Sequence, residues 1–254
     1  MDDRQLLRYS RHLLLDELGP DAQARFASAH ALIVGAGGLG NPAAQFLASA
    51  GVGTITLVDA DEVDLTNLQR QILFAMADVG APKVDAAARR MGAVNPEVRI
   101  VPLRERVGEP RLRELAAAAD VVLDCTDNFA TRHAINRACV QARRPLVSGA
   151  AIRFDGQLAV FDTREPSAPC YHCLFGEGDD LEETRCATMG VFAPLVGIVG
   201  AVQAAEALKL VAGVGRSLAG RLLLLDALAM EWRELRVPRD PACPVCAQRP
   251  GEGP

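Results

Sequence analysis

The strongest constraint on the fold is a glycine-rich turn, GAGGLG (35–40), that lies between two apolar runs in the stretch ALIVGAGGLGNPAAQFLASAGVGTITLVDADEV. Glycine lets the backbone approach a ligand closely, and the N-terminus of a following helix presents free N–H groups to phosphates. Asp59 ends the second apolar run, nineteen residues after Gly40, where a Rossmann-type site places an acid that accepts hydrogen bonds from ribose hydroxyls. The segment therefore predicts a nucleotide with a ribose, and it leaves NAD and ATP equally open. A turn that only allows a helix to pack closely on a sheet is the alternative.

The rest of the chain repeats this alternation of apolar, β-branched runs with alanine-rich amphipathic segments. It predicts an α/β fold, a Rossmann-like and mostly parallel sheet with helices on both faces, extended by antiparallel strands at 152–160 and 221–235. Strands are expected at 31–35, 54–58, 98–103, 121–124, 145–148, 157–161 and 221–226. Helices are expected at 2–17, 39–50, 65–73, 82–93, 109–119, 130–142 and 194–212. We expect a single domain over 1–254, with a nucleotide-binding half at about 1–145, and a long loop at 162–190.

Composition disfavours several classes of partner. The 254 residues carry a formal net charge of -5, which gives no reason to expect nucleic acid or a membrane surface. No run of eighteen apolar residues occurs, and the N-terminus MDDRQLLRYSRHLLLDELG has acids and arginines where a secretory signal needs an apolar core. We therefore expect a cytoplasmic protein.

Polar side chains beyond Asp59 separate the two nucleotides. Asn67, Arg70 and Lys83 supply one amide and two cations, and Asp127 follows the apolar run VVLDC. Hydride transfer needs no such cations. A polyphosphate does, because cations stabilise the charge of a departing pyrophosphate and a carboxylate such as Asp127 can hold Mg²⁺. The set favours phosphoryl or nucleotidyl transfer from ATP, although each residue alone could be a solvated helix charge or a helix cap.

Four of the seven cysteines form two pairs of metal-ligand spacing, PCYHC and CPVC, with sixty-nine residues between them. In a reducing compartment two such pairs predict a structural, tetrahedral Zn²⁺ site of four thiolates that joins the C-terminal tail to the long loop. A redox dithiol is the rival interpretation. The predicted zinc ligands are Cys170, Cys173, Cys243 and Cys246. Cys125 and Cys139 are interpreted as buried small apolar residues.

In order and approximate spacing, the motifs resemble those of the ThiF/MoeB/HesA group of ubiquitin-activating-type adenylyltransferases, and within it the bacterial molybdopterin-synthase type. The resemblance runs nearly end to end and rests on YSRH at 9–12, GAGGLG, VDADEVDLTNLQRQ, GAPKV, DCTDN, SGAAIRFDGQLAVF, PCYHC, CATMGVFAPLVGIVGAVQAAEALKL and CPVC. It implies that ATP is bound without a Walker-type loop, with Gly38 on the phosphates, Asp59 on the ribose and Asp127 on Mg²⁺. The full set of implied ATP-binding residues is Gly38, Asp59, Asp61, Thr66, Asn67, Arg70, Lys83, Asp127 and Asn128.

The resemblance also implies a reaction and partners. The substrate would be a small ubiquitin-fold sulfur carrier ending in Gly-Gly, bound by the half at about 146–254, whose terminal carboxylate attacks the α-phosphorus of ATP. The family forms homodimers in which an N-terminal arginine, here Arg11, reaches the partner's site. Cys186 stands where sulfur-transferring members have a cysteine that bonds to the carrier, with a dispensable loop thiol as the alternative. The implied catalytic residues are Arg11, Arg70, Lys83, Asp127 and Cys186.

The expected function is thus ATP-dependent adenylylation of a sulfur carrier in molybdenum cofactor biosynthesis, with the thiamine-pathway carrier next. Some relatives carry a C-terminal rhodanese domain, whereas this chain stops eight residues after Cys246, so sulfur is expected from a separate protein. Two alternatives of another class remain: an NAD-dependent oxidoreductase, which the cations disfavour, and a non-catalytic zinc-containing adaptor. Within the family, the two CxxC pairs disfavour a tRNA-modifying dehydratase.

Overall fold

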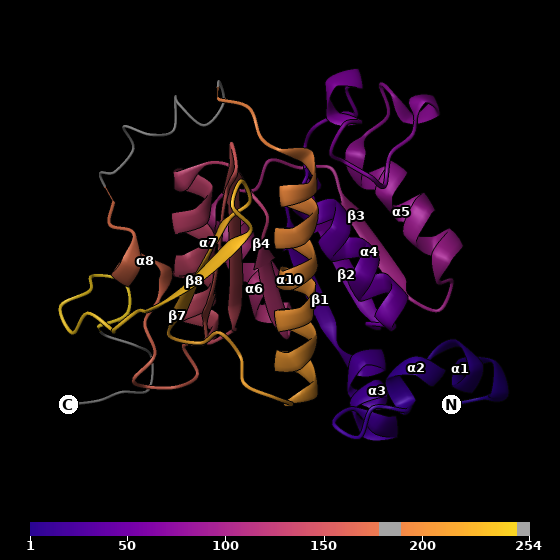
Figure 1. Cartoon of the computed structure of the whole chain (residues 1–254). Helices are drawn as coiled ribbons and strands as arrows, with labels where there is room; N and C mark the ends of the chain where they lie inside the picture. Colours follow the sequence, from indigo (N-terminus) through magenta and orange to yellow (C-terminus); the bar gives the residue numbers. More distant parts are fainter. Residues whose placement is uncertain (178–188, 248–254) are drawn as a thin grey trace.

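The computed structural model describes residues 1–177 and 189–247, and its centre is one sheet of eight strands in the order β3-β2-β1-β4-β5-β6-β7-β8 (Figure 1). Neighbouring strands from β3 to β5 run parallel, and β6, β7 and β8 continue the sheet antiparallel. The predicted fold class is therefore confirmed. The strands are β1 (His30–Val34), β2 (Thr54–Val58), β3 (Arg99–Leu103), β4 (Val121–Asp124), β5 (Leu146–Ile152), β6 (Asp155–Phe161), β7 (Arg221–Asp226) and β8 (Glu231–Arg236).

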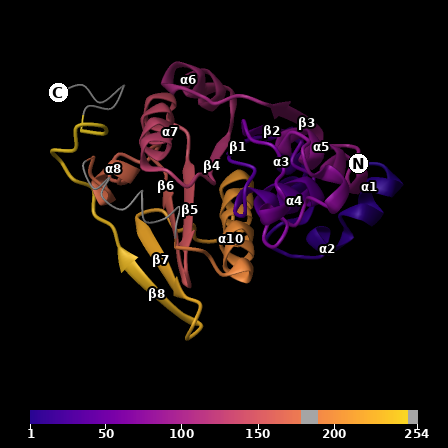
Figure 2. The ribbon, with the colours of Figure 1, turned by 90° about the horizontal axis from the view of Figure 1, so that it is seen from above.

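Helices cover both faces of the sheet, as Figure 2 shows from above. One face packs against α4 (Gly40–Ala50), α5 (Lys83–Val94) and α10 (Ala193–Ala212). The other face packs against α6 (Glu109–Ala118) and α7 (Phe129–Ala142). The first strands are buried on both faces, so they read as continuous apolar runs such as HALIV and TITLV. At the free edge, β8 is exposed along its whole length.

The order of the strands fixes where a ligand can bind. Successive strands are added on one side of β1 up to β3 and on its other side from β4 onward, so the strand order reverses between β1 and β4. In open α/β sheets ligands bind beyond the carboxyl ends of the strands at such a switch point. Val34 at the end of β1 is in register with Val58 on β2 and with Asp124 on β4. The three strands thus end together, and the segments that follow them lie at one edge of the sheet.

Helix α10 links this edge to the opposite end of the molecule. It is the one helix in the described residues that is long and apolar enough to cross a membrane by length and composition. In this fold its apolar surface packs on the sheet and on α4. The amide of Gln203 is buried and donates to the carbonyl oxygens of Asp124 (2.7 Å) and Val147 (3.2 Å). These bonds to β4 and β5 fix the helix against the sheet.

The N-terminal region differs from the prediction of one helix at 2–17. It forms α1 (Asp3–Arg8) and α2 (Ser10–Leu13), separated at Tyr9, which has φ -96° and ψ 10°. A further helix, α3 (Gly19–Ser28), was not predicted. The Gly-Pro pair at its start resembles a break, but proline in the first helical turn is compatible with helix initiation because its missing N–H would have no helical partner there.

Two loop predictions also need correction. The helix expected at 65–73 is only the short 3₁₀ turn η1 (Leu65–Asn67), followed by η2 (Met76–Asp78). The backbone N–H of Leu73 donates to the buried Asn41 side chain (2.8 Å), a tertiary contact that replaces the expected helical continuation. Within the long loop expected at 162–190, the structure contains the short helix α8 (Tyr171–Leu174).

Two glycines give a matched test of the close packing at the glycine turn. A Cβ on Gly40 would lie 1.9 Å from the carbonyl oxygen of Gly35, whereas a Cβ on Gly92, inside α5, would meet nothing within 4 Å. We expect Gly40→Ala to lower the free energy of unfolding by about 3 kcal/mol, because backbone must move. Gly92→Ala should raise it by about 0.5–1 kcal/mol. Urea denaturation of both variants measures the difference, and equal stability of the two would contradict the packing argument.

Candidate functional site

The glycine turn is held against the end of β4. Gly35 has φ +100°, and a Cβ there would lie 2.6 Å from the carbonyl oxygen of Cys125. At Gly38 a Cβ would lie 3.0 Å from Val196, near the start of α10. Close packing against backbone and a positive φ therefore require glycine at position 35, and at Gly38 a side chain would be tight against Val196. The turn lies between β4 and α10, and both glycines are suited to a nearby phosphate.

The acid after β2 is tied to the same turn. Asp59 is half-buried, and its carboxylate accepts hydrogen bonds from the backbone N–H of Ala36 (2.7 Å) and of Asp61 (2.8 Å). The two bonds fix Asp59 beside the glycine turn. Because each carboxylate oxygen can accept more than one hydrogen bond, Asp59 retains capacity for ribose hydroxyls.

The cation at the start of α5 is buried and paired. The side chain of Lys83 is only 8% exposed, and its Nζ lies 3.0 Å from Oδ2 of Asp61, whose side chain is 57% exposed. A backbone bond from Lys83 N to Asp61 O (3.0 Å) fixes the same two residues. The ammonium group is thus held close to the segment that follows Asp59, with its carboxylate partner on the solvent side.

The η1 turn organises the remaining predicted residues around Asp64, which the sequence analysis did not single out. Its carboxylate accepts from the Thr66 backbone N–H (2.8 Å) and hydroxyl (2.6 Å), and both bonds, the hydroxyl first, lower the pKa of Asp64. The Asp64 backbone N–H donates to Oδ1 of Asn67 (3.0 Å), and Nη1 of Arg70 donates to the Thr66 carbonyl (3.1 Å). Asn67 therefore acts locally as a capping residue. The D-x-T pattern was the available signal for Asp64.

In the segment after β4, the adjacent residues Asp127 and Asn128 have different roles. Asn128 is the N-cap of α7, and its Oδ1 accepts from the backbone N–H of Thr131 (2.9 Å). The interpretation of Asp127 as the N-cap is therefore wrong. Asp127 is exposed, one residue before the cap, and follows the strand that ends opposite Val34. Its carboxylate lies on the surface at the edge where the glycine turn also lies.

Beneath Asp127 the structure contains a buried ion pair that sequence reasoning missed. Asp124 is fully buried and accepts from Ser148 Oγ (2.8 Å) and from the Thr126 hydroxyl (2.7 Å). Arg132 on α7 has its Nε 4.0 Å from Asp124 and donates from Nη2 to the Thr126 carbonyl (2.7 Å). Burial acts most strongly and lowers the pKa of Arg132, but Asp124, Tyr171 and Asp127 together outweigh it, so the pKa is raised and the guanidinium stays charged. This pair fixes the backbone immediately before Asp127.

Arg11 lies at the other end of the molecule. It is exposed on α2, next to His12, whose ring lies 5.9 Å from that of Phe26. Phe26 packs with Ala212 at the end of α10, while Val196, near its beginning, lies against the glycine turn. Val196 and Ala212 are sixteen positions apart, which corresponds to about 24 Å of helix. Helix α2, which carries Arg11, therefore lies far from the glycine turn of its own chain (Figure 1).

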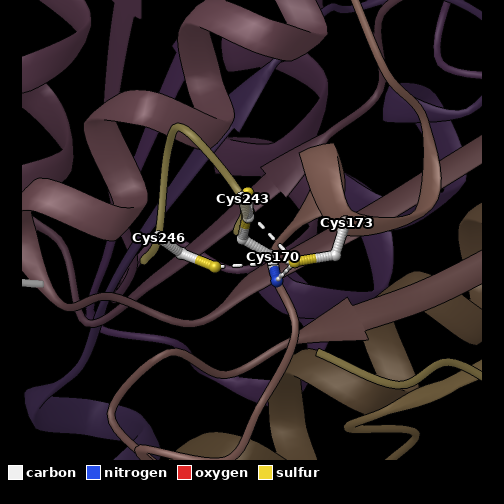
Figure 3. Close-up of side chains that lie close together, drawn as sticks. All are labelled: Cys170, Cys173, Cys243 and Cys246. Atoms are coloured by element: carbon white, nitrogen blue, oxygen red, sulfur yellow. Dashed lines mark hydrogen bonds between the residues drawn. The ribbon is translucent and has the colours of Figure 1, made fainter. Parts of the chain in front are cut away.

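The four cysteines of the two CxxC pairs come together beside α7, as Figure 3 shows. Their sulfur atoms lie within 4.8 Å of one another, and the closest distances are 3.5 Å (Cys173 to Cys246), 3.7 Å (Cys170 to Cys243) and 3.9 Å (Cys170 to Cys173). A tetrahedron of thiolates with Zn–S bonds of 2.3 Å has edges of about 3.8 Å. The arrangement therefore fits a tetrahedral metal ion.

The remaining cysteines divide into two groups. Cys125 and Cys139 are buried, and burial raises the pKa of both thiols, so they remain protonated. Their interpretation as buried small residues is confirmed. Cys186 lies outside the described residues.

Fold and site together define a nucleotide-binding α/β protein whose glycine turn, acid and cations follow the strands of a topological switch point. The chain matches the ThiF family model over residues 9–245. It is 45% identical over 251 residues to the molybdopterin-synthase adenylyltransferase of Escherichia coli (strain K12), covering 98% of this chain and 99% of that protein. It is 46% identical over 246 residues to the sulfur carrier protein ThiS adenylyltransferase of the same organism, covering 97% of each. This chain therefore belongs to the ThiF family, and it is an adenylyltransferase.

A solved structure supports the same assignment. The crystal structure of E. coli MccB with ATP has a TM-score of 0.82 to this chain and is 25% identical, covering 94% of this chain and 73% of that one. The family resemblance inferred from the motifs is thus confirmed over nearly the whole chain.

Adjacent residues at the start of α7 give a test of the site's geometry. We expect Asn128→Ala to lower the free energy of unfolding by about 1 kcal/mol, because the helix loses its cap. Asp127→Ala should change it by no more than about 0.5 kcal/mol, because that side chain is exposed. Thermal denaturation compares the two, and a larger loss from Asp127→Ala would place a structural role on Asp127.

Proposed function

We propose that the enzyme adenylylates the C-terminal glycine carboxylate of a small ubiquitin-fold sulfur carrier, using ATP and releasing pyrophosphate, in molybdenum cofactor biosynthesis. The observation that carries the proposal is the convergence of the glycine turn, Asp59 and Asp127 at one edge of the sheet, with Lys83 paired to Asp61 in the following segment. The relatives named for molybdopterin synthase and for ThiS are 45% and 46% identical, so the thiamine-pathway carrier is the alternative substrate.

In this proposal ATP binds without a Walker-type loop. Gly38 lies against the phosphates and Asp59 accepts from the ribose hydroxyls. The implied polyphosphate contacts are those of Asn67, Arg70 and Lys83, with Asp61, Thr66 and Asn128 beside them. In the described structure Arg70 and Lys83 have neighbouring partners, a carbonyl and an exposed carboxylate. A triphosphate carries more negative charge than either, so both cations would turn toward it.

The chemistry needs charge compensation more than proton transfer. The carrier's terminal carboxylate is already ionised, and its oxygen forms a bond to the α-phosphorus while the bond to the bridging oxygen of pyrophosphate breaks. The departing oxygen keeps the electron pair, and Arg70 and Lys83 offset its charge. Asp127 would hold Mg²⁺, which would supply further charge neutralisation to the phosphates. No side-chain base is required.

The assembly follows from the position of Arg11. Arg11 is exposed, and about 24 Å of helix separates the end of α10 near Arg11 from the glycine turn. We therefore infer that Arg11 serves the site of a partner subunit in a homodimer.

The halves 1–145 and 146–254 contribute strands to one sheet, which supports a single domain. The enzyme would act in the cytoplasm. Cys186 would bond to the activated carrier or be dispensable, and sulfur would come from a separate protein.

Two rivals of another class remain testable. Hydride transfer by an NAD-dependent oxidoreductase needs no cations such as Arg70 and Lys83. The solved structure of a similar fold with ATP also favours the triphosphate. A non-catalytic adaptor would use the cysteine cluster and an exposed surface without turnover. Pyrophosphate formation from ATP and a carrier excludes the adaptor, and binding of a nicotinamide nucleotide in place of ATP would favour the oxidoreductase.

The decisive experiment offers the molybdopterin and thiamine carriers separately and measures carrier-dependent ATP:pyrophosphate exchange. We expect exchange with one carrier, and its loss by at least about 100-fold in Asp127→Ala with no change in the unfolding transition. Asp21→Ala, an exposed acid on α3, is the matched control and should retain full exchange. Full exchange by Asp127→Ala would remove the proposed metal role of that carboxylate.

We further propose that the four-cysteine cluster holds one structural Zn²⁺, since four thiolates close the tetrahedral shell and leave no position for substrate. Metal analysis should find about one Zn²⁺ per chain. Cys243→Ser should lose it and unfold at lower temperature, because the ion joins the tail to α8. Cys139→Ala, which removes a buried cysteine outside the cluster, should keep the metal. A folded, zinc-free protein that resists chelators would instead support a redox dithiol.

A further inference from the structure

Tyr9 is inserted into a notch on the nucleotide-binding half of the chain. It joins α1 to α2 and is buried, although most of its neighbours in both helices are not. Its hydroxyl lies where a side chain on Gly51 would be, 2.6 Å from the position of a Cβ on that glycine. Gly51 ends α4 with φ +85°. The tyrosine therefore fits against a helix end that glycine keeps open.

The hydroxyl of Tyr9 is fixed by two side chains that follow α5. It accepts from Nδ2 of Asn95 (2.9 Å) and donates to Oε2 of Glu97 (3.3 Å). Asn95 is fully buried, and its amide also donates to the carbonyl of Ala48 on α4 (2.8 Å). Burial, together with Glu97, raises the pKa of Tyr9 despite the bond from Asn95, so the proton that it donates stays bound at neutral pH. Contacts with α4 and with the segment after α5 thus define one position for the hydroxyl.

The same residue sets the start of the helix that carries Arg11. The carbonyl of Tyr9 accepts from the backbone N–H of His12 (2.9 Å) and of Leu13 (3.0 Å), so it defines the first turn of α2. On the other side of Arg11, Nδ1 of His12 lies 3.4 Å from Oε1 of Gln23 on α3. Arg11 is held between two anchored neighbours, and its own side chain projects to the surface.

We propose that Tyr9 is a positioning residue for the reaction: its bonds to Asn95 and Glu97 fix the place from which Arg11 reaches the nucleotide site of the partner subunit. This inference rests on the proposed function, in which Arg11 acts in trans. The ring alone would fill the notch, but the two bonds of the hydroxyl fix its depth and angle, and small displacements of a charged group reduce its effect on a transition state steeply.

The first experiment compares Tyr9→Phe, Arg11→Ala and the double variant by carrier-dependent ATP:pyrophosphate exchange. We expect Arg11→Ala to lower kcat by about 100-fold or more and Tyr9→Phe by about 10-fold, with the KM for ATP little changed. In the Arg11→Ala background, Tyr9→Phe should have no further effect, because the group that it positions is absent. A structural role would lower kcat by the same factor in both backgrounds, and that result would overturn the proposal.

A stability control separates positioning from a general loss of folding. Ile135→Val, buried in the core on the other face of the sheet, removes one methylene and should lower the melting temperature without changing kcat. Tyr9→Phe should lose more activity than Ile135→Val at the same loss of melting temperature. If Tyr9→Phe loses no more kcat than Ile135→Val for the same loss of melting temperature, the proposal fails.

The second experiment tests which subunit Tyr9 serves. One chain carries Tyr9→Phe and a second, differently tagged chain carries Asp127→Ala. The two are co-expressed, and the mixed dimer is purified. One of its two sites then combines an intact Asp127 with an Arg11 positioned by Tyr9, so about half of the wild-type exchange should return. No recovery would overturn the positioning of a trans arginine by Tyr9.

The outcomes distinguish this inference from the proposed function. If Arg11→Ala loses exchange while Tyr9→Phe keeps the wild-type kcat, only the inference fails. If Arg11→Ala keeps full exchange, or if the chain is a monomer from which no mixed dimer forms, the trans role of Arg11 fails and the inference fails with it. If exchange is absent from the wild type with every carrier, the proposed function itself fails.

Discussion

The rest of the nucleotide site depends on one close approach, that of the glycine turn to the end of β4. The absence of a Cβ at Gly35 and Gly40 lets the turn contact the Cys125 backbone and lets α4 begin directly beside it. Once the turn is there, Asp59 can tie it to the end of β2 through the N–H of Ala36. The exposed Asp127 then lies at the same edge because β4 is the neighbour of β1. The site is thus a consequence of strand order and of backbone packing.

A second layer of buried polar groups fixes this edge from below. Asp124 and Arg132 hold the backbone before Asp127, and Gln203 binds the carbonyl of Asp124 from α10. A buried charge pair of this kind is a poor source of net stability, because desolvation offsets most of the attraction. Its effect is to restrict the backbone to one conformation. Buried residues such as Asp124, Arg132 and Gln203 therefore determine the position of the segment that carries Asp127, although they lie beneath the proposed ATP site.

Much of this arrangement was predictable from the sequence, for identifiable reasons. Apolar runs of period and length typical of buried strands predicted the sheet, and the CxxC spacing predicted the cysteine cluster. The features that the sequence did not predict depend on tertiary contacts. The segment at 65–73 has helical composition, but its Leu73 N–H bonds to Asn41. Tyr9 interrupts the N-terminal helix at a notch made by distant residues, and the role of Asp124 depends on Ser148 and Arg132. A local pattern contains none of this information.

The free edge of the sheet has a consequence for solubility. Strand β8, with the sequence EWRELR, is exposed along its length, and among residues 1–177 and 189–247 no further strand pairs with its outer side. Four of its six side chains are charged, with both signs represented. Addition of a strand from another molecule would bring these charges against a neighbouring backbone and strip them of water, which is unfavourable. The charged edge thus discourages uncontrolled growth of the sheet into aggregates, while the protein keeps an open strand at its surface.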